Sequence, residues 1–260
     1  MTAGGEPASS EPCRPAAGLR HRWTVAVGAF FFRNRNAAFP IIFALTVLLL
    51  RPRVLGGPAM DHLLVMCGAV VALLGEGVRL ATIGFEYIER GGKEGKVYAS
   101  RLVQGGIYAH TRNPMYLGNL MIAIGMAMAT GAPAAYALII PAFLCIYLAI
   151  TSTEEAFLRN RFGREYEDYC ARVPRFFPSL RGLRRTLSGM RYHWKRSLRQ
   201  DLSTLVGLLL GLSLLPVWRT FFLHGFAAAT TLAPRAFGFS GGILAGYWAV
   251  YWLKKHGRLQ

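Results

Sequence analysis

Polar and aromatic side chains gather between residues 102 and 119, in a stretch that lies between hydrophobic segments. Its chemically useful members are Gly105, Gly106, Tyr108, His110, Arg112, Asn113, Tyr116 and Asn119. The guanidinium of Arg112 is a planar fork of donors that suits a carboxylate or a phosphate. Gly105 and Gly106 let the backbone approach a ligand closely or adopt unusual dihedral angles. So many polar groups beside apolar segments predict a ligand site.

Asn113 and Pro114 form a good helix start, because asparagine caps free amides and proline fits the first turn. The positive end of the helix dipole would then favour an anionic or polar ligand group. Tyr116 and Asn119 follow Asn113 at helical spacing and fall toward one side. On spacing alone, the less favoured alternative is a plain capped helix with interfacial tyrosines and a snorkelling Arg112.

A second candidate is the acidic pair Glu154 and Glu155, which follows a long apolar run. Two acids directly beside a membrane hairpin can bind a cation or a ribose. Thr151 stands three residues before Glu154, so a capping box is the alternative interpretation.

The composition favours a membrane protein over a nucleic-acid-binding protein. The chain has 260 residues, of which 53% are hydrophobic, yet its formal charge is +17. Nucleic-acid-binding domains are rarely so apolar, whereas apolar runs with a basic excess are typical of membrane proteins whose loops face anionic lipid. The four cysteines lie far apart, so neither a zinc site nor a disulfide framework is indicated.

Apolar runs predict an all-α polytopic membrane protein with about six spans. The runs cover residues 37–50, 62–83, 116–130, 132–150, 202–222 and 243–253. Residues 23–32 are too few to span and predict an interfacial helix, while 226–239 fits a loop or a half-helix. Glu76 and Arg79 share a helix face inside the second run, as a structural ion pair or a cofactor contact.

Two charged segments flank these spans on one side. Residues 151–173 keep a helical stripe made of Leu158, Phe162, Tyr166, Tyr169 and Val173, and Pro174 ends the helix. Residues 180–199 carry seven Lys and Arg and no acid, typical of a helix on anionic headgroups or of a solvated basic linker.

The charge distribution sets the expected orientation and organisation. The hairpin turn at Gly131 is uncharged, so the positive-inside rule places both termini, the basic loops and the polar stretch on the cytoplasmic side. We expect a disordered tail over residues 1–22, a membrane core over 23–180, and a basic interfacial segment with C-terminal helices over 181–260. Residues 84–101 predict an aqueous loop before the polar stretch.

The order of these motifs resembles the isoprenylcysteine carboxyl methyltransferase and phospholipid methyltransferase superfamily. The matching text is L-V-x-x-G-I-Y-x-x-x-R-N-P-M-Y-L-G at 102–118, E-E-x-x-L-x-x-x-F-G-x-x-Y-x-x-Y at 154–169 and V-P-R at 173–175. The resemblance covers residues 60–180 and implies an integral membrane enzyme, without a Rossmann domain, that uses S-adenosylmethionine to methylate a lipid-embedded acceptor.

The resemblance also implies which residues bind the methyl donor, within motifs at 100–119 and 150–178. The implied lining residues are Ser100, Arg101, Leu102, Val103, Gly106, Tyr108, Asn113, Pro114, Met115 and Tyr116. Glu154 would hold the polar end of the cofactor, with Arg112 and Glu155 close by as catalytic candidates. Tyr108 and Tyr116 suit the cationic sulfonium, because aromatic faces attract cations.

This chain differs from the carboxyl methyltransferases at two positions that bear on the methyl acceptor. Carboxyl methyltransferases of this superfamily look like R-H-P where this chain has Asn113, and they place an arginine where this chain has Ile150. The prenylcysteine carboxylate is therefore disfavoured, and an amine acceptor would need a base, for which His110 and Glu155 are the candidates. A membrane sterol reductase using NADPH and a non-catalytic lipid-binding protein remain the alternatives.

Overall fold

The computed structural model describes residues 19–85, 99–256 and 258, and within these ranges every element is a helix. The elements are α1 (Leu19–Leu49), α2 (Pro58–Phe85), the short 3-10 helix η1 (Gly106–Ala109), α3 (Pro114–Thr130), α4 (Pro133–Phe162), α5 (Arg164–Arg172), α6 (Leu183–Ser188), α7 (Trp194–His224) and α8 (Phe226–Lys255). The predicted all-α class is confirmed. Most of the predicted tail and most of the 84–101 loop lie outside the described residues.

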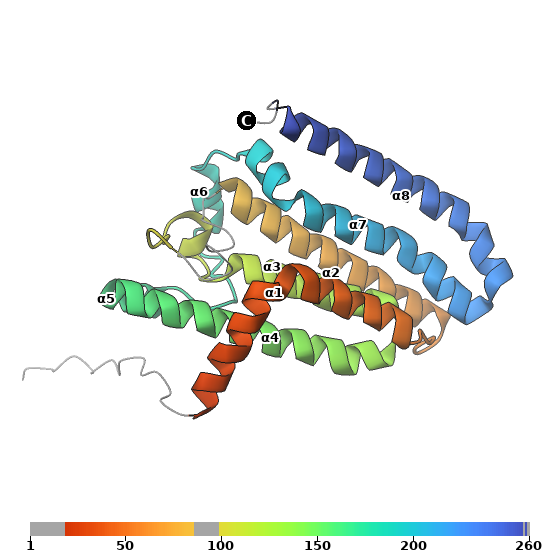
Figure 1. Cartoon of the computed structure of the whole chain (residues 1–260), viewed down its shortest axis with the longest axis horizontal. Coiled ribbons are helices and arrows are strands. Elements are labelled where there is room, and N and C mark those ends of the chain that lie inside the picture. The colour runs from red at the N-terminus through yellow and green to blue at the C-terminus, as the bar shows by residue number, and fades with distance from the viewer. Residues whose placement is uncertain (1–18, 86–98, 257, 259–260) are drawn as a thin grey trace, which may run out of the picture.

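Three helices, α2, α4 and α7, are long and apolar enough to cross a bilayer, and Ala37–Leu49 and Pro114–Thr130 are shorter apolar helical stretches. Large apolar side chains such as Leu63 and Leu74 of α2 are more than half exposed, as expected of a surface in contact with lipid. The protein is an integral membrane protein. In Figure 1 the long helices run side by side, with α5 and α6 gathered at one end of the bundle.

The α2–α3 pair forms the centre of the bundle and is packed through glycine. A Cβ atom added at Gly68 or at Gly75 would lie 2.6 Å from the carbonyl oxygen of Gly125 or Gly118, respectively. Small residues at such crossings let two backbones approach closely, which is how helices associate in membranes. The close crossing brings Arg79 of α2 against α3.

One expected element boundary was wrong, because residues 23–32 and 37–49 belong to one continuous helix, α1. Within it the guanidinium of Arg35 lies 4.6 Å from the ring centre of Phe32. Arginine does not break a helix, because its long stem can lie along apolar surface while its charge reaches a polar site. Residues 226–239, left open between a loop and a half-helix, form the first part of α8 despite Pro234.

The predicted stripe over 158–173 is confirmed, with a corner in the middle of it. α4 ends at Phe162, Gly163 turns the chain with φ of +53°, and α5 begins at Arg164. Tyr166, Tyr169 and Val173 are buried, and Leu102 packs against them. α5 therefore holds the segment that leads into α3.

Two hydrogen bonds also fix the position of the segment that leads into α3. The Tyr169 hydroxyl donates to the carbonyl oxygen of Tyr108 at 2.7 Å, and Arg161 Nε donates to the carbonyl oxygen of Ala99 at 2.8 Å. Burial raises the pKa of Tyr169 above its ordinary value, so the hydroxyl keeps the proton that it donates.

At the opposite end of the bundle, Arg219 of α7 ties three elements together. Its guanidinium lies 2.6 Å from Asp61 of α2 and donates at 2.6 Å to the carbonyl oxygen of Thr130, where α3 ends. A buried arginine needs such partners, because an unpaired charge there costs several kcal/mol, on the order of 3–5. α7 is thus part of the core bundle.

Candidate active site

A cavity of about 1060 Å³ follows one side of α3. Its walls come from α1, α2, α3, α4, α5 and α7, from η1 and from the segment before it. The sequence-predicted residues that line it are Ser100, Arg101, Leu102, Val103, Tyr108, Arg112, Asn113, Pro114, Met115, Tyr116, Glu154 and Glu155. One cavity therefore brings together two motifs that lie about forty residues apart.

The start of α3 opens into this cavity. Pro114 occupies the first turn and Asn113 the cap position, as predicted, but the Asn113 side chain makes no capping hydrogen bond. Its amide nitrogen donates instead to the carbonyl oxygen of Arg175 at 3.1 Å, with Glu155 Oε1 at 3.5 Å. The amides of the first turn are thus left without a side-chain cap, which suits an anionic ligand group.

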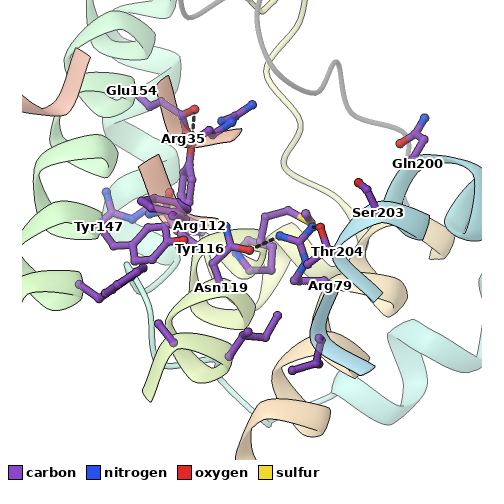
Figure 2. A pocket seen from close by; sticks show the side chains of 18 of the residues that line it. Arg35, Arg79, Arg112, Tyr116, Asn119, Tyr147, Glu154, Gln200, Ser203 and Thr204 are labelled. Carbon is purple, nitrogen blue, oxygen red and sulfur yellow. Dashed lines mark hydrogen bonds between the residues drawn. The ribbon is translucent and has the colours of Figure 1, made fainter. Parts of the chain in front are cut away.

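Tyr116 and Glu154 form the direct link between the two motifs. The Tyr116 hydroxyl donates to Glu154 Oε1 at 2.5 Å, and Arg35 of α1 lies beside this pair (Figure 2). Thr151 sits inside α4, where its hydroxyl donates to the carbonyl oxygen of Tyr147 at 2.8 Å. The capping-box interpretation of Glu154 was therefore wrong, since the helix does not begin there.

Arg112 and Glu155 form the centre of a second charged group. Glu155 Oε1 lies 3.4 Å from Arg112 Nη1 and 3.1 Å from Arg175 Nε. Burial acts to lower the pKa of Arg112, but the charge of Glu155, with help from Cys170, outweighs it and raises the pKa. Arg112 therefore stays charged, and its buried Nε has no hydrogen-bond partner among the residues that the structure describes. Because Arg112 and Arg175 both pair with the carboxylate of Glu155, this group of three side chains carries a net positive charge.

His110 and Gly106 lie outside the cavity lining. The ring nitrogens of His110 are 2.8 Å from the carbonyl oxygen of Ser179 and 2.9 Å from the hydroxyl of Thr186 on α6. Gly106 opens η1 with φ of +60°, a conformation that favours glycine. Both residues shape the segment that carries the site, and His110 fastens it to α6.

Sequence reasoning missed the wall that α7 contributes. Gln200, Ser203, Thr204, Gly207 and Leu208 line the cavity, although they lie beyond the region of resemblance. One signal was available, because Asp201 is the sole acid between residues 169 and 260, and it opens an apolar run. A lone acid in such a place needs a cationic partner.

That partner is Arg79. Its guanidinium contacts both oxygens of Asp201, and the Nε–Oδ2 distance is 3.1 Å. It also donates to Thr204 at 3.1 Å and to the amide oxygen of Asn119, and its Nε lies 3.4 Å from Glu76. The predicted Glu76–Arg79 pair is confirmed as a buried ion pair, and Arg79 lines the cavity as well.

A scan against protein families matches residues 64–165 to the phospholipid methyltransferase family. A cobalt-zinc-cadmium resistance protein, CzcN, of Cupriavidus metallidurans is 31% identical over 176 residues, which cover 66% of this chain and 74% of that protein. The chain belongs to the isoprenylcysteine carboxyl methyltransferase and phospholipid methyltransferase superfamily. It is a membrane methyltransferase.

Two further relatives of this methyltransferase match over shorter stretches. A nickel-cobalt-cadmium resistance protein, NccN, of Alcaligenes xylosoxydans is 33% identical over 82 residues, 32% of this chain and 38% of that protein. The protein-S-isoprenylcysteine O-methyltransferase of Schizosaccharomyces pombe is 36% identical over 77 residues, 30% of this chain and 33% of that protein. No solved structure matches the chain.

Proposed function

We propose that this methyltransferase takes its methyl group from S-adenosylmethionine and transfers it to the polar head of a lipid in the bilayer. The observation that carries the proposal is the continuity of the cavity, which runs from the charged start of α3 to Thr130 at its other end. α3 has 17 residues, so at about 1.5 Å per residue that distance is roughly 25 Å. The polar end of the cavity suits the methyl donor, and the long apolar end suits the tail of a lipid acceptor. Both substrates could therefore be bound side by side in one cavity.

The polar end fits the donor. The uncapped start of α3 and the unpartnered Nε of Arg112 offer hydrogen bonds to the carboxylate of its amino-acid part. Glu154, held by Tyr116, would accept hydrogen bonds from its amino group or ribose. When bound, the donor supplies an electrophilic methyl group on a cationic sulfonium, which the rings of Tyr108 and Tyr116 stabilise by about 0.5–2 kcal/mol.

The remaining charged candidates position these groups. Glu155 is bridged by two arginines, so we assign it to orienting Arg112. His110 has both ring nitrogens in contact with Ser179 and Thr186, so we assign it to bracing the segment before α3. Methyl transfer is an in-line displacement, and the main task of the protein is to align two substrates and exclude water.

The apolar end fits a lipid tail. Its walls are formed by side chains of α1, α3, α4 and α7, among them Phe39, Ile42, Phe43, Ile122, Ala123, Met126, Phe143 and Leu208. These residues lie in apolar helices, so an acceptor can enter from the bilayer while its head remains near the donor.

We further propose that the donor end faces the cytoplasm. α5, α6, the start of α7 and the loops that join them lie at that end and carry many arginines, among them Arg172, Arg181, Arg184, Arg185, Arg191 and Arg196. The positive-inside rule assigns such an end to the cytoplasmic side, and anionic headgroups attract each exposed cation by about 1 kcal/mol.

Calorimetry on the detergent-purified protein tests the donor assignment. We expect S-adenosylhomocysteine to bind and NADPH to give no signal. Glu154→Gln and Tyr116→Phe should each weaken that binding about tenfold, because the first removes the negative charge that faces the donor and the second removes the hydroxyl that holds Glu154. Glu167→Gln and Tyr251→Phe, at exposed positions, are the matched controls.

NADPH binding in place of the homocysteine product would favour a reductase, and binding of neither would favour a non-catalytic protein. Incubation with methyl-labelled donor and total membrane lipid then identifies the acceptor, as the species that takes up label.

A further inference from the structure

The segment between α5 and α7 exposes large apolar side chains although it is not part of a membrane span. Phe177 is 85% exposed and Leu180 is 73% exposed, more than any other large apolar side chain among the described residues. Tyr192, and Trp194 at the start of α7, are also exposed. An apolar patch of this kind marks a surface that contacts lipid or a partner.

Cations surround these apolar side chains. Residues 180–199 contain seven Lys and Arg and no acid. Apolar and aromatic side chains among cations are typical of a surface that binds anionic headgroups, because the cations attract phosphates while the rings enter the interface. A solvated basic linker, the alternative interpretation of this sequence, does not account for the exposure of Phe177 and Leu180. We call residues 177–199 the basic surface. Its exposed cations include Arg181, Arg184, Arg185, Arg191 and Arg199.

The basic surface lies where three helices of the bundle begin or end. The Thr186 hydroxyl on α6 is 2.9 Å from Nε2 of His110, which precedes α3. The backbone amide of His193, which precedes α7, donates at 2.8 Å to the carbonyl oxygen of Gly84 in the last turn of α2. Because α2 and α7 are long and apolar enough to cross a bilayer, these ends lie at the level of the headgroups. Figure 1 shows α6 at this end of the bundle.

The chain on both sides of Phe177 is bonded to the residues that precede α3. The backbone amide of Arg112 donates to the carbonyl oxygen of Pro174 at 2.9 Å. The backbone amide of Ser179 donates to the carbonyl oxygen of His110, also at 2.9 Å. A contact that fixes Phe177 at the membrane therefore also fixes the backbone at the start of α3.

We infer that the basic surface binds the anionic headgroups of the leaflet that it faces, and that this binding holds the start of α3 in the shape that receives the methyl donor. Phe177 and Leu180 enter the interface, and the arginines around them pair with lipid phosphates. An acidic soluble protein would meet the same cations, but the apolar side chains and the level of the helix ends favour lipid. The lipid contact stands on the exposed side chains, whereas its effect on the donor rests on the proposed function.

A fluorescent reporter at position 180 tests the lipid contact. In a background whose own cysteines are replaced by serine, Leu180→Cys carries a polarity-sensitive dye, and the protein is placed in nanodiscs of phosphatidylcholine with or without phosphatidylglycerol. The emission should lie further to the blue in the anionic nanodiscs. The double variant Arg184→Gln, Arg185→Gln should remove this difference. Lys254→Gln, Lys255→Gln is the matched control, since it removes two exposed cations at the end of α8 and should keep the difference.

Donor affinity in the same nanodiscs tests the effect on α3, in the protein with its native cysteines. S-adenosylhomocysteine should bind about fivefold more tightly in the anionic nanodiscs than in phosphatidylcholine alone. Phe177→Ser should remove this difference, as should the double variant at Arg184 and Arg185. The control at Lys254 and Lys255 should retain it. Because Phe177 is exposed, its variant should unfold at the wild-type temperature.

The outcomes separate the lipid contact, the link to α3 and the proposed function. Equal emission in the two kinds of nanodisc would overturn the lipid contact and leave an acidic soluble partner as the occupant. A blue shift with equal donor affinity in both lipids, or a difference in affinity that survives in both variants of the basic surface, would overturn the link to α3. A protein that shows the blue shift but binds S-adenosylhomocysteine in neither lipid would instead contradict the proposed function, with the lipid contact supported.

Discussion

Tyr116, Glu154, Arg112 and Glu155 could be predicted as a site because each belongs to a local pattern. Tyr116 follows a helix start at helical spacing, and the two glutamates stand at the end of an apolar run. The partners of Arg79 could not be predicted in this way. Asp201 lies 122 residues from Arg79, and a pairing at that separation depends on tertiary packing, which spacing does not report.

Arg79 gives a stability prediction at this scale. Arg79→Met leaves Glu76 and Asp201 buried without their cation, and should lower the free energy of unfolding by about 3–5 kcal/mol. The triple variant Glu76→Gln, Arg79→Met, Asp201→Asn removes the whole charge group and should be more stable than the single variant. Thermal unfolding in detergent measures both. A single variant as stable as the triple one would contradict this account of the cluster.

Arg112 gives a binding prediction. Arg112→Lys keeps the positive charge but loses the planar fork, and should weaken S-adenosylhomocysteine binding about tenfold. Arg164→Lys, at an exposed position on α5, is the control and should bind normally. Wild-type affinity in Arg112→Lys would show that the site uses only the charge of Arg112.

Among the elements, α1 and α7 account for most of what sequence analysis left out. Arginines at 33 and 35 suggested an end to a helix, whereas α1 continues and places Arg35 beside Glu154. α7 was expected to belong to a separate C-terminal part, yet it lines the cavity and pairs with α2. In both helices a charged residue that suggested a boundary instead lies beside a charged partner inside the bundle: Arg35 lies beside Glu154, and Asp201 pairs with Arg79.

The α2–α3 crossing gives a prediction at the scale of elements. A Cβ at Gly118 would lie 2.6 Å from Arg79 Cγ and 2.7 Å from the carbonyl oxygen of Gly75. Gly118→Ala should therefore separate the helices, cost about 1–3 kcal/mol and weaken lipid binding. Gly246→Ala on α8, with open space around it, should instead stabilise the protein by up to about 1 kcal/mol.

Thermal unfolding of the two glycine variants, compared with wild type, checks these opposite signs. If Gly118→Ala proved as stable as Gly246→Ala, the close crossing of α2 and α3 would not be needed for the fold.

For the whole molecule, the bundle has two chemically different ends. α5, α6 and the start of α3 lie at one end, where residues 180–199 carry seven Lys and Arg and no acid, and the uncharged turn at Gly131 lies at the other end. The arginines near that second end are partly engaged within the protein, since Arg219 pairs with Asp61 and Arg51 lies over the ring of Phe222. Of the six predicted spans, three lie in helices long and apolar enough to cross a membrane, α2, α4 and α7, and two lie in the shorter apolar stretches Ala37–Leu49 and Pro114–Thr130.

The proposed orientation predicts the outcome of cysteine labelling. In a background whose own cysteines are replaced by serine, Ala59→Cys should react with an impermeant maleimide on intact cells. Arg184→Cys should react only after the membrane is permeabilised, because it lies at the arginine-rich end. The reverse pattern would place the donor site on the outer side of the membrane.

The uncapped start of α3 has a consequence for the protein in the cell. A ligand that completes the hydrogen bonds of this helix binds the folded state and not the unfolded one, so it stabilises the fold by mass action. At a ligand concentration one hundred times Kd, the gain is about 2.7 kcal/mol. The lifetime of this protein would therefore follow the supply of its methyl donor, and a cell short of the donor would also hold less of the enzyme.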